Sequence, residues 1–376
     1  MTAEPMEPIQ LSLQACRERQ GRLAAELSKQ DLTAAIFSSH ENVQYFTGFR
    51  PHWMLQPLLL IDASGHSTLV APNSIPNHFA ADEVLVHEGQ WHSTLRQDQL
   101  SSASNALRDF HGDFLGRVGV EASLAGNGVL VMLNITDLSR VVDIQPTIWT
   151  LRRRKDEDEL LMIRRAVACT EAMYKKAREI IKPGISELDV YNSLHAAAVE
   201  IAGEPLTALG ADYQCNSPGG PPRDRLAVAG ELYILDLGPV YRGYWADNCR
   251  TFAVDGRPSD VQLAAWQAVI SALDFVERTV RPGTSCRELF QDVQAMLDEH
   301  RPGAFGHHLG HGIGLFAHET PHLNPHWDDH FEEGDVFTAE PGVYYDALQA
   351  GIRLEQNYVV TRDGIERLTS FPLELA

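Results

Sequence analysis

The chain has 376 residues, of which 44% are hydrophobic, and these values predict a folded protein with two domains or one large domain. Its 31 basic and 51 acidic side chains give a formal net charge of −20, which excludes nucleic-acid binding through a general basic surface. No run of about 18 apolar residues occurs, and residues 1–20 contain no apolar core of a secretory signal. The five cysteines are odd in number and include no C-x-x-C pair, so we expect a reducing, cytoplasmic environment and no disulfide framework.

The N-terminal part of the chain alternates between helical and strand-like patterns. The patterns predict one helix and five strands, over residues 11–30 for the helix and 32–37, 58–61, 67–70, 118–121 and 141–144 for the strands. The second and third strands flank a turn-forming segment and should form a hairpin. This mixture indicates an α/β domain over residues 1–152. It ends at a charged run from Arg152 to Glu159, which we interpret as a solvated linker and helix start.

The remaining residues, 153–376, have strong helical patterns and a weak internal repeat. The predicted helices cover residues 160–181, 186–201, 259–280 and 285–300. The first pair is joined by Lys182-Pro183-Gly184 and the second pair by Arg281-Pro282-Gly283, each followed after one residue by a serine. This repeat, spaced by 99 residues (283 − 184), indicates two related α/β halves about a pseudo-twofold axis. Chance similarity of two helix–turn–helix segments is the alternative.

Two aspartates lie within one predicted β-hairpin, over residues 232–254. If the turn centres on Tyr241-Arg242, Asp236 lies directly opposite Asp247, and the two side chains share one face of the sheet. Two carboxylates in an apolar sheet repel each other, so they either share a proton or bind a cation. In the alternative interpretation, one of the aspartates lies at a strand end and faces water.

Later segments supply further candidate metal ligands. Residues 305–325 contain five histidines, and neutral imidazole is a common metal ligand and proton carrier. Two strand-like segments that follow carry Glu340 and Glu355, and Arg353 is an alternative, purely structural partner for Glu355. Four carboxylates and one imidazole carry a combined charge of −4, which balances two divalent cations. Such an oxygen-rich site suits manganese, with iron, cobalt or zinc as alternatives, and two ions about 3.5–4 Å apart can activate a bridging water.

Several motifs of the second region resemble those of the prolidase, aminopeptidase P and methionine aminopeptidase family, which has the pita-bread fold. The motifs D-x10-D, H-x3-H-G-x-G-x3-H-E, E-P-G and R-x-E match, in order, Asp236 and Asp247, His307, His311 and His318 with Glu319, Glu340, and Arg353 with Glu355. The resemblance implies a C-terminal pita-bread domain with duplicated halves over residues 153–376.

The N-terminal region resembles the creatinase/prolidase N-terminal domain. Residues 41–49 read ENVQYFTGF, which is similar to the N-I-x-Y-L-T-G-F phrase of that domain. Because methionine aminopeptidase lacks this domain, the resemblance points to the prolidase/aminopeptidase P branch. Creatinase shares the fold without the metals, whereas all five ligand positions are intact in this chain.

The resemblance also implies roles for the metal-binding residues. Asp236 would bind one metal ion, Asp247 and Glu355 would bridge both ions, and His311 and Glu340 would complete the second site. The implied cofactors are therefore two divalent ions.

The implied catalytic residues are Glu340, His307, His318 and Arg353. Glu340 would act as general base on the bridging water. His307 and His318 would contact substrate and stabilise the intermediate or move a proton. Arg353 would orient Glu355. The implied activity is cleavage of the bond before proline in short peptides, by a chain that we expect to form a homodimer, as relatives with this N-terminal domain often do.

One position departs from the family pattern. Peptidases of this family usually carry a histidine in a P-H-G-x-P-(S/T)-D-R loop, but residues 218–225 read PGGPPRDR, with Gly219 at the position of the histidine. That histidine helps to bind substrate and stabilise the oxyanion in relatives, and the candidates to replace it are Asp212, Tyr213, Arg223 and Arg225. The departure leaves open a non-peptide substrate, with the protein acting as a cyclic amidine or amide hydrolase or as a lyase. A non-catalytic binding module is a third hypothesis, disfavoured because such relatives usually lose metal ligands.

Overall fold

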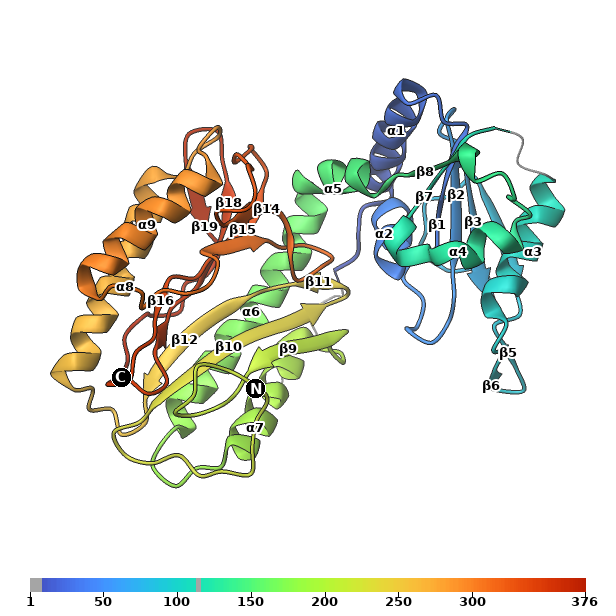
Figure 1. Ribbon diagram of the computed structural model, residues 1–376. Coiled ribbons are helices and arrows are strands. Elements are labelled where there is room, and N and C mark those ends of the chain that lie inside the picture. The colour runs from blue at the N-terminus through green and yellow to red at the C-terminus, as the bar shows by residue number, and fades with distance from the viewer. Residues whose placement is uncertain (1–8, 113–115) are drawn as a thin grey trace. The chain divides into compact units, whose positions relative to one another are not determined.

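The computed structural model of the protein describes residues 9–112 and 116–376, which form two compact units (Figure 1). One unit contains residues 10–152, and the other contains residues 153–376 together with Ile9. Each unit has its own β-sheet structure and its own buried apolar core.

The unit of residues 10–152 is built on a six-stranded sheet with the order β4-β3-β2-β1-β7-β8. Its strands are β1 (Ala34–Phe37), β2 (Leu58–Asp62), β3 (Ser67–Pro72), β4 (Glu83–His87), β7 (Val118–Val120) and β8 (Val141–Asp143). β2 pairs antiparallel with both β1 and β3, whereas β7 pairs parallel with β1 and with β8. The five predicted strands and the predicted hairpin are thus confirmed. A small ribbon of β5 (Gln90–Trp91) and β6 (Thr94–Leu95) stands apart from this sheet.

This unit also contains helices, and all of them except the short 3₁₀ helix bury apolar side chains. They are α1 (Leu13–Lys29), α2 (His40–Thr47), α3 (Gln99–His111), α4 (Ala122–Met132), the short 3₁₀ helix η1 (Leu138–Arg140) and α5 (Gln145–Arg153), which ends at the unit boundary. The predicted first helix is confirmed as α1. It begins after Ser12, whose hydroxyl accepts a hydrogen bond from the N–H of Ala15, and it buries Leu23 and Leu27.

The unit of residues 153–376 contains two pairs of packed helices, as the sequence predicts. They are α6 (Glu157–Ile180) with α7 (Glu187–Ala202), and α8 (Asp260–Thr279) with α9 (Cys286–His300). Helix α6 begins three residues before the predicted start, because the N–H of Asp156 donates to the Glu159 carboxylate and three acidic residues fill the first turn.

The two helix pairs of the internal repeat have equivalent turns and equivalent backbone hydrogen bonds. Each helix pair is joined by a Pro-Gly turn whose glycine has a positive φ, 88° at Gly184 and 89° at Gly283. The N–H of Gly184 donates to the carbonyl oxygen of Ala227, and the N–H of Gly283 donates to that of Phe331, both over 2.8 Å. The two halves of the unit therefore repeat the same turn, the same serine cap and the same return strand contact.

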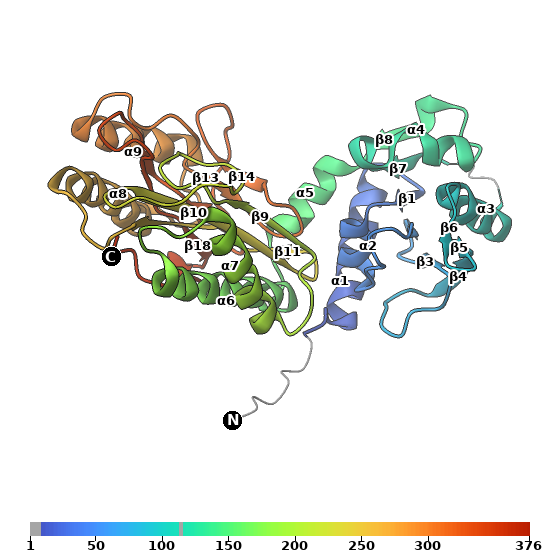
Figure 2. The same cartoon turned by 90° about the horizontal axis from the view of Figure 1, so that it is seen from below.

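The strands of the two halves lie between the helix pairs, as both views show (Figures 1 and 2). In the first half, β10 (Leu232–Tyr241) pairs with β9 (Ala208–Asp212), β11 (Tyr244–Trp245) and β12 (Asn248–Ala253). The second half has a five-stranded sheet with the order β14-β13-β15-β18-β19 and a two-stranded ribbon of β16 and β17. These strands are β13 (Gly310–Gly312), β14 (Glu319–Leu323), β15 (Val336–Ala339), β16 (Gly342–Val343), β17 (Ile352–Arg353), β18 (Gln356–Val360) and β19 (Ile365–Arg367).

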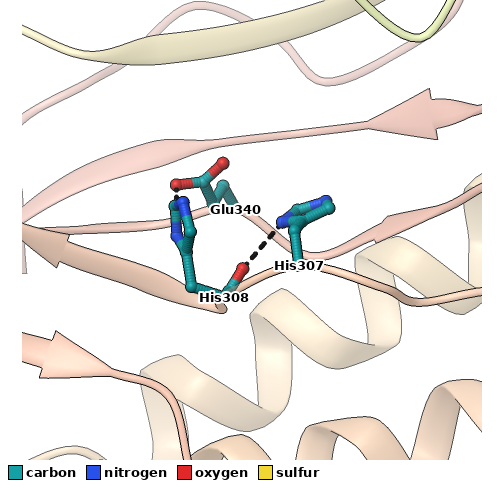
Figure 3. Close-up of side chains that lie close together, drawn as sticks. All are labelled: His307, His308 and Glu340. Atoms are coloured by element: carbon teal, nitrogen blue, oxygen red, sulfur yellow. Dashed lines mark hydrogen bonds and ion pairs between the residues drawn. The ribbon is translucent and has the colours of Figure 1, made fainter. Parts of the chain in front are cut away.

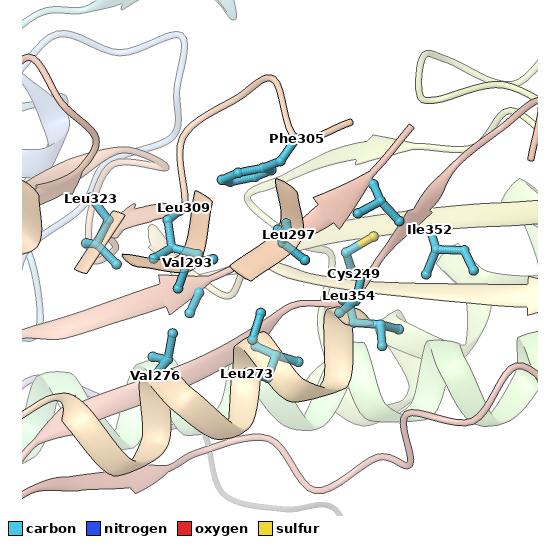
Figure 4. Close-up of a cluster of buried hydrophobic side chains, with 14 of the residues drawn as sticks. Cys249, Leu273, Val276, Val293, Leu297, Phe305, Leu309, Leu323, Ile352 and Leu354 are labelled. Carbon is cyan, nitrogen blue, oxygen red and sulfur yellow. The ribbon is translucent and has the colours of Figure 1, made fainter. Parts of the chain in front are cut away.

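An apolar core fixes the second helix pair against the strands (Figure 4). Leu273 and Val276 of α8 and Val293 and Leu297 of α9 are almost fully buried, and they pack in one cluster with side chains from the strands, including Leu354. Burial of each such side chain contributes about 1.5–3 kcal/mol. The mixed α/β architecture with duplicated halves confirms the predicted fold class.

The register of the hairpin that carries the two aspartates differs from the prediction. The turn is formed by Arg242 and Gly243, with φ values of 48° and 88°, and not by Tyr241-Arg242. Positive φ at both central residues suits a two-residue turn that matches strand twist, and glycine adopts it without strain. Asp236 consequently pairs with Cys249. Asp247 lies two residues from Cys249, so it is a diagonal neighbour of Asp236 and not its direct partner.

Arg250 ties the chain segments of this unit together. Its side chain is almost fully buried, and it donates hydrogen bonds to the backbone carbonyl oxygens of Glu355, Phe371 and Pro372, over 2.5–3.0 Å. The guanidinium carbon lies 5.4 Å from the ring centroid of Tyr174. One side chain of β12 therefore holds both the segment before β18 and the C-terminal segment.

We predict that Arg250→Met lowers the free energy of unfolding by about 3 kcal/mol or more, because several buried carbonyl oxygens lose their donor. Urea unfolding followed by circular dichroism measures this loss. Arg367→Met is the matched control, since the Arg367 side chain is 49% exposed and its ion pair with Glu277 is long; we expect a change below about 0.5 kcal/mol. A loss below about 1 kcal/mol for Arg250→Met would contradict this account of the arginine.

Candidate metal centre

Nine side chains from segments that are far apart in sequence line one cavity in the unit of residues 153–376. The cavity has a volume of about 280 Å³. It is lined by Asp236, Asp247, His307, His308, His311, His318, Glu340, Arg353 and Glu355. The lining includes every residue that the sequence indicated as a metal ligand or catalytic residue. Because each of these side chains is ionisable, the cavity suits ions and polar groups better than apolar ligands.

The backbone at each candidate ligand explains why these side chains reach the cavity. Asp236 lies within β10 and His311 within β13. Asp247 falls in the break between β11 and β12, Glu340 in the break between β15 and β16, and Glu355 in the break between β17 and β18. A residue in such a break is released from the strict alternation of a strand, so its side chain can turn toward the cavity.

The carboxylates and the imidazole form two groups that share Glu355. In one group, ligand atoms of Asp247, His311 and Glu355 lie within 4.8 Å of one another. In the other, ligand atoms of Asp236, Glu340 and Glu355 do so. Glu355 is therefore the ligand that belongs to both groups.

Both carboxylate oxygens of Glu355 are buried and have no hydrogen-bond partner within the described part of the chain. The residue is only 1% exposed. A buried carboxylate without a partner is costly, and such groups in native proteins are paired or coordinate metals. No lysine lines the cavity, and the guanidinium of Arg353 donates elsewhere. The donor set of this centre therefore fits divalent cations.

Burial and mutual repulsion raise the pKa of three of the carboxyl groups. Burial raises the pKa of Asp236 to about 6, although Arg353 opposes the shift. Burial and the neighbouring carboxylates raise the pKa of Asp247 and of Glu355 well above their usual range. Glu340 behaves differently: burial acts to raise its pKa, but the nearby histidines, above all His308, hold it below the usual range. Glu340 is therefore the carboxylate of the centre that is most readily ionised.

The tautomer of His311 is set by its backbone. Nδ1 lies 3.1 Å from the carbonyl oxygen of Gly312, a geometry in which Nδ1–H donates and Nε2 keeps its lone pair. Nε2 faces Asp247 and Glu340 at 3.8 and 3.6 Å. Burial lowers the pKa of His311 to about 4, which keeps the ring neutral and able to bind a metal ion.

Amide side chains hold the two strand breaks in place. Asn357 donates to the carbonyl oxygen of Asp247, and Asn248 donates to that of Glu355 over 2.7 Å. Arg250 donates to the same carbonyl of Glu355. Asn357 belongs to β18, which follows Glu355, and Asn248 belongs to β12, which follows Asp247. The strand that follows each ligand therefore holds the backbone of the other ligand.

Arg353 does not have the partner that the sequence suggested. The prediction that it orients Glu355 is wrong, because its Nη2 donates to Asp236 over 2.7 Å and to Asp212 over 2.9 Å. The alternation of a continuous strand would place Arg353 and Glu355 on one face, but the strand is broken after Arg353. The Nη1 of Arg353 donates to the hydroxyl of Tyr344 over 3.1 Å.

Two adjacent histidines contact the other groups of the centre in different ways (Figure 3). His307 lies with Nδ1 2.8 Å from the carbonyl oxygen of His308 and Nε2 3.0 Å from the hydroxyl of Tyr344. His308 turns its Nδ1 to within 3.2 Å of Oε1 of Glu340. Burial acts to lower the pKa of His308, but the Glu340 carboxylate raises it above its usual value. His308 is the residue that sequence reasoning missed, and its place beside a conspicuous motif histidine was the available signal.

His318 lies flat against His311, with ring centroids 3.8 Å apart and an interplanar angle of 10°. Burial lowers its pKa. Stacking fixes the His318 ring without using either of its nitrogens, so the ring nitrogens remain candidates for a hydrogen bond to a bound molecule.

Residues 162–362, more than half of the chain, match metallopeptidase family M24, and the chain belongs to that family. The family implies divalent metal ions, in agreement with the donor set described above. Residues 19–154 match the creatinase/prolidase N-terminal domain.

Relatives and solved structures of this family cover nearly the whole chain. A Xaa-Pro dipeptidase of Pyrococcus horikoshii is 26% identical over 367 residues, which are 95% of this chain and 98% of that protein. A Xaa-Pro dipeptidase from Bacillus anthracis has a similar structure, with a TM-score of 0.82, 22% identity and coverage of 96% and 99%. An Escherichia coli aminopeptidase P variant in complex with substrate has a TM-score of 0.77, 21% identity and coverage of 96% of both chains. These likenesses confirm the predicted fold.

Among the helices of the described residues, none combines the length and the apolar character needed to cross a lipid bilayer.

We predict that Glu355→Gln weakens metal binding without lowering the stability of the metal-free protein. In chelator-treated protein the free energy of unfolding should stay constant or rise, because one charge is removed from a group of repelling carboxylates. Added manganese chloride should raise the melting temperature of the wild type, because binding to the folded state stabilises it, and should raise that of the variant far less. Calorimetry measures both. Glu366→Gln, at a side chain that is 52% exposed, is the control and should respond to manganese as the wild type does. An equal response of Glu355→Gln would count against this centre.

Proposed function

We propose that the protein is a metal-dependent Xaa-Pro peptidase that cleaves the bond before proline in short peptides. The observation that carries the proposal is Glu355, whose two buried, unpaired oxygens lie where the two groups of ligand atoms meet. Membership of metallopeptidase family M24 and the likeness to a Xaa-Pro dipeptidase over 95% of the chain support it.

The proposal assigns two divalent ions to the five ligands. By the resemblance to the family, Asp236 would hold one ion, Asp247 and Glu355 would contact both, and His311 and Glu340 would complete the second. Manganese suits this oxygen-rich set. When bound, the ion pair supplies positive charge that activates a water molecule and stabilises negative charge developing on the substrate carbonyl.

The side chains around the ions have separate tasks in the proposal. Glu340 would accept a proton from the attacking water and pass it on to the nitrogen of the leaving amine, and neutral His308, 3.2 Å from its Oε1, would hold that proton between the two steps. His307 is held by Tyr344 and lines the cavity beside His308. His318 donates to the substrate from its stacked position. We also propose that the partners are a short peptide substrate and a second copy of the chain, and that the protein acts in the cytoplasm.

A panel of proline-containing peptides tests the activity. Purified protein loaded with manganese is incubated with Xaa-Pro dipeptides and with tripeptides that carry proline in second position, and released amino acids are quantified. Matched peptides with alanine in place of proline are the control. The expected result is turnover of the proline peptides only. Turnover that does not exceed a metal-free blank for every peptide would defeat the proposal.

The glycine at position 219, where the family usually has a histidine, supports a second candidate function. In this function the same centre catalyses the hydrolysis of a non-peptide substrate or a lyase reaction. Asp212, a carboxylate, lies beside the position where peptidases of the family usually carry a histidine. Cyclic amidines and amides are the substrates to include in the panel. Brisk cleavage of Gly-Pro by the unmodified protein would exclude this candidate.

We predict that His308→Ala lowers kcat about 100-fold with a much smaller change in KM, because removal of a residue that moves a proton weakens the chemical step. His326→Ala, at an exposed histidine of the same unit, is the control and should leave both constants unchanged. Steady-state kinetics on whichever peptide is turned over fastest measures the effect. A change confined to KM would show that His308 only binds substrate.

A further inference from the structure

Asp212 is a carboxylate at the metal centre that the proposed ligand set does not use. It is the last residue of β9, and its Cα pairs with that of Asp236 across the β9–β10 ladder. Directly opposed residues of an antiparallel pair carry their side chains on the same face of the sheet. The strand pairing therefore places the Asp212 carboxylate beside a metal-binding residue.

A single guanidinium nitrogen joins the two aspartates. Nη2 of Arg353 donates to Oδ2 of both Asp236 and Asp212, and the arginine side chain is only 10% exposed. Without Asp212, the positive charge of Arg353 would be directed at Asp236 alone and would compete with a cation for its oxygens. Asp212 supplies one negative charge that offsets the arginine.

The loop that follows β9 closes around the Asp212 carboxylate. The N–H of Gly220 donates to its Oδ1 over 2.7 Å, and the carbonyl oxygen of Pro218 accepts from Arg353 over 3.3 Å. A Cβ atom on Gly219 would lie 2.4 Å from Oδ2 and 2.8 Å from Cγ of Asp212, closer than any side chain can approach without displacing the aspartate. The present position of Asp212 and a histidine at residue 219 thus exclude each other.

Three other side chains were candidates to replace the loop histidine, and the two arginines among them have ion-pair partners elsewhere. Arg223 forms an ion pair with Glu187 at 2.7 Å, and Arg225 forms one with Glu231. Tyr213 is buried against another tyrosine ring. The carboxylate at the end of β9 is the candidate that contacts the metal centre.

We propose that Asp212 is a positioning residue of the metal centre. It shares the Nη2 of Arg353 with Asp236 and offsets the charge of the arginine, so that Asp236 keeps its affinity for the cation. Gly219 is required for this role of Asp212, because a side chain at residue 219 would fill the space that the Asp212 carboxylate occupies. The inference rests on the proposed dinuclear site, and it concerns cation binding independently of which substrate the site turns over.

Calorimetric titration of chelator-treated protein with manganese chloride tests the role directly. Asp212→Asn keeps the size of the side chain and an acceptor for the Gly220 N–H but removes the charge. We expect the dissociation constant of at least one bound Mn²⁺ to rise about tenfold, the usual effect of losing a group that supports a metal ligand. In protein loaded with Co²⁺ as a spectroscopic probe, the visible absorption bands should change in position or intensity, because Asp236 is reoriented.

Ser217→Ala is the matched control for a disturbed loop. The Ser217 hydroxyl donates to the carbonyl oxygen of Gly219 and to Gln214, so its removal loosens the same loop without changing the Asp212 carboxylate. Its manganese affinity should stay within about twofold of the wild type, and its cobalt spectrum should be unchanged.

A double-mutant cycle tests whether Asp212 and Gly219 form one unit. Gly219→His alone forces the aspartate out of its hydrogen bonds and should weaken manganese binding about tenfold or more. Asp212→Gly combined with Gly219→His removes the same carboxylate that Gly219→His alone displaces, so the double variant should bind manganese no more weakly than either single variant, a strongly non-additive result.

Two results would overturn the inference: Asp212→Asn that binds manganese as the wild type does with an unchanged cobalt spectrum, or additive effects in the cycle. Failure of the proposed function has a different signature, since the wild type would then bind no manganese or turn over no substrate. If a glycine variant does not fold, Asp212→Asn alone decides.

Discussion

Mutual repulsion of buried carboxylates is the constraint on which the site-bearing unit depends. Asp236, Asp247 and Glu355 all have pKa values raised by burial and by their neighbours, and Glu355 has no hydrogen-bond partner in the described residues. A fold that gathers such groups loses stability unless cations neutralise them, so the free energy of metal binding is partly free energy of folding. The centre is therefore an element of the architecture as well as the place of the proposed chemistry.

The duplicated frame makes this arrangement rigid. Two helix pairs with equivalent Pro-Gly turns enclose the strands, and the ligands lie at strand breaks where side chains escape alternation. Broken strands are weak points, and they are stabilised by bonds across the halves: Arg250 and Asn248 of β12 hold the carbonyl of Glu355, while Asn357 of β18 holds that of Asp247. Asp247 and Glu355 are thus each positioned by the strand that follows the other along the chain.

Sequence patterns predicted α1, the four helices α6 to α9 and five strands of the first sheet, because periodicity and Pro-Gly punctuation are local properties, but they missed α2 to α5 and β4. The hairpin turn was misplaced by one residue because the positive φ of Arg242 beside Gly243 was not recognised. The partner of Arg353 was wrong because alternation assumes an unbroken strand. The contact of Asp212 with Arg353 could not be predicted at all, since it requires β9 to pair with β10 in one register, a property of the tertiary structure.

Gly219, at the position of the usual loop histidine, has a structural consequence beyond the loss of an imidazole. Taken alone, the glycine indicates the loss of a group that binds substrate. In the folded chain the same glycine accommodates the Asp212 carboxylate, which contacts Arg353. The exchange replaces an imidazole by a negative charge and offsets the arginine that would otherwise weaken Asp236 as a ligand. Under the proposed role of Asp212, this exchange would favour cation binding at Asp236 and would remove an imidazole that could face a developing oxyanion, so the same pair of residues would affect both cation affinity and substrate choice.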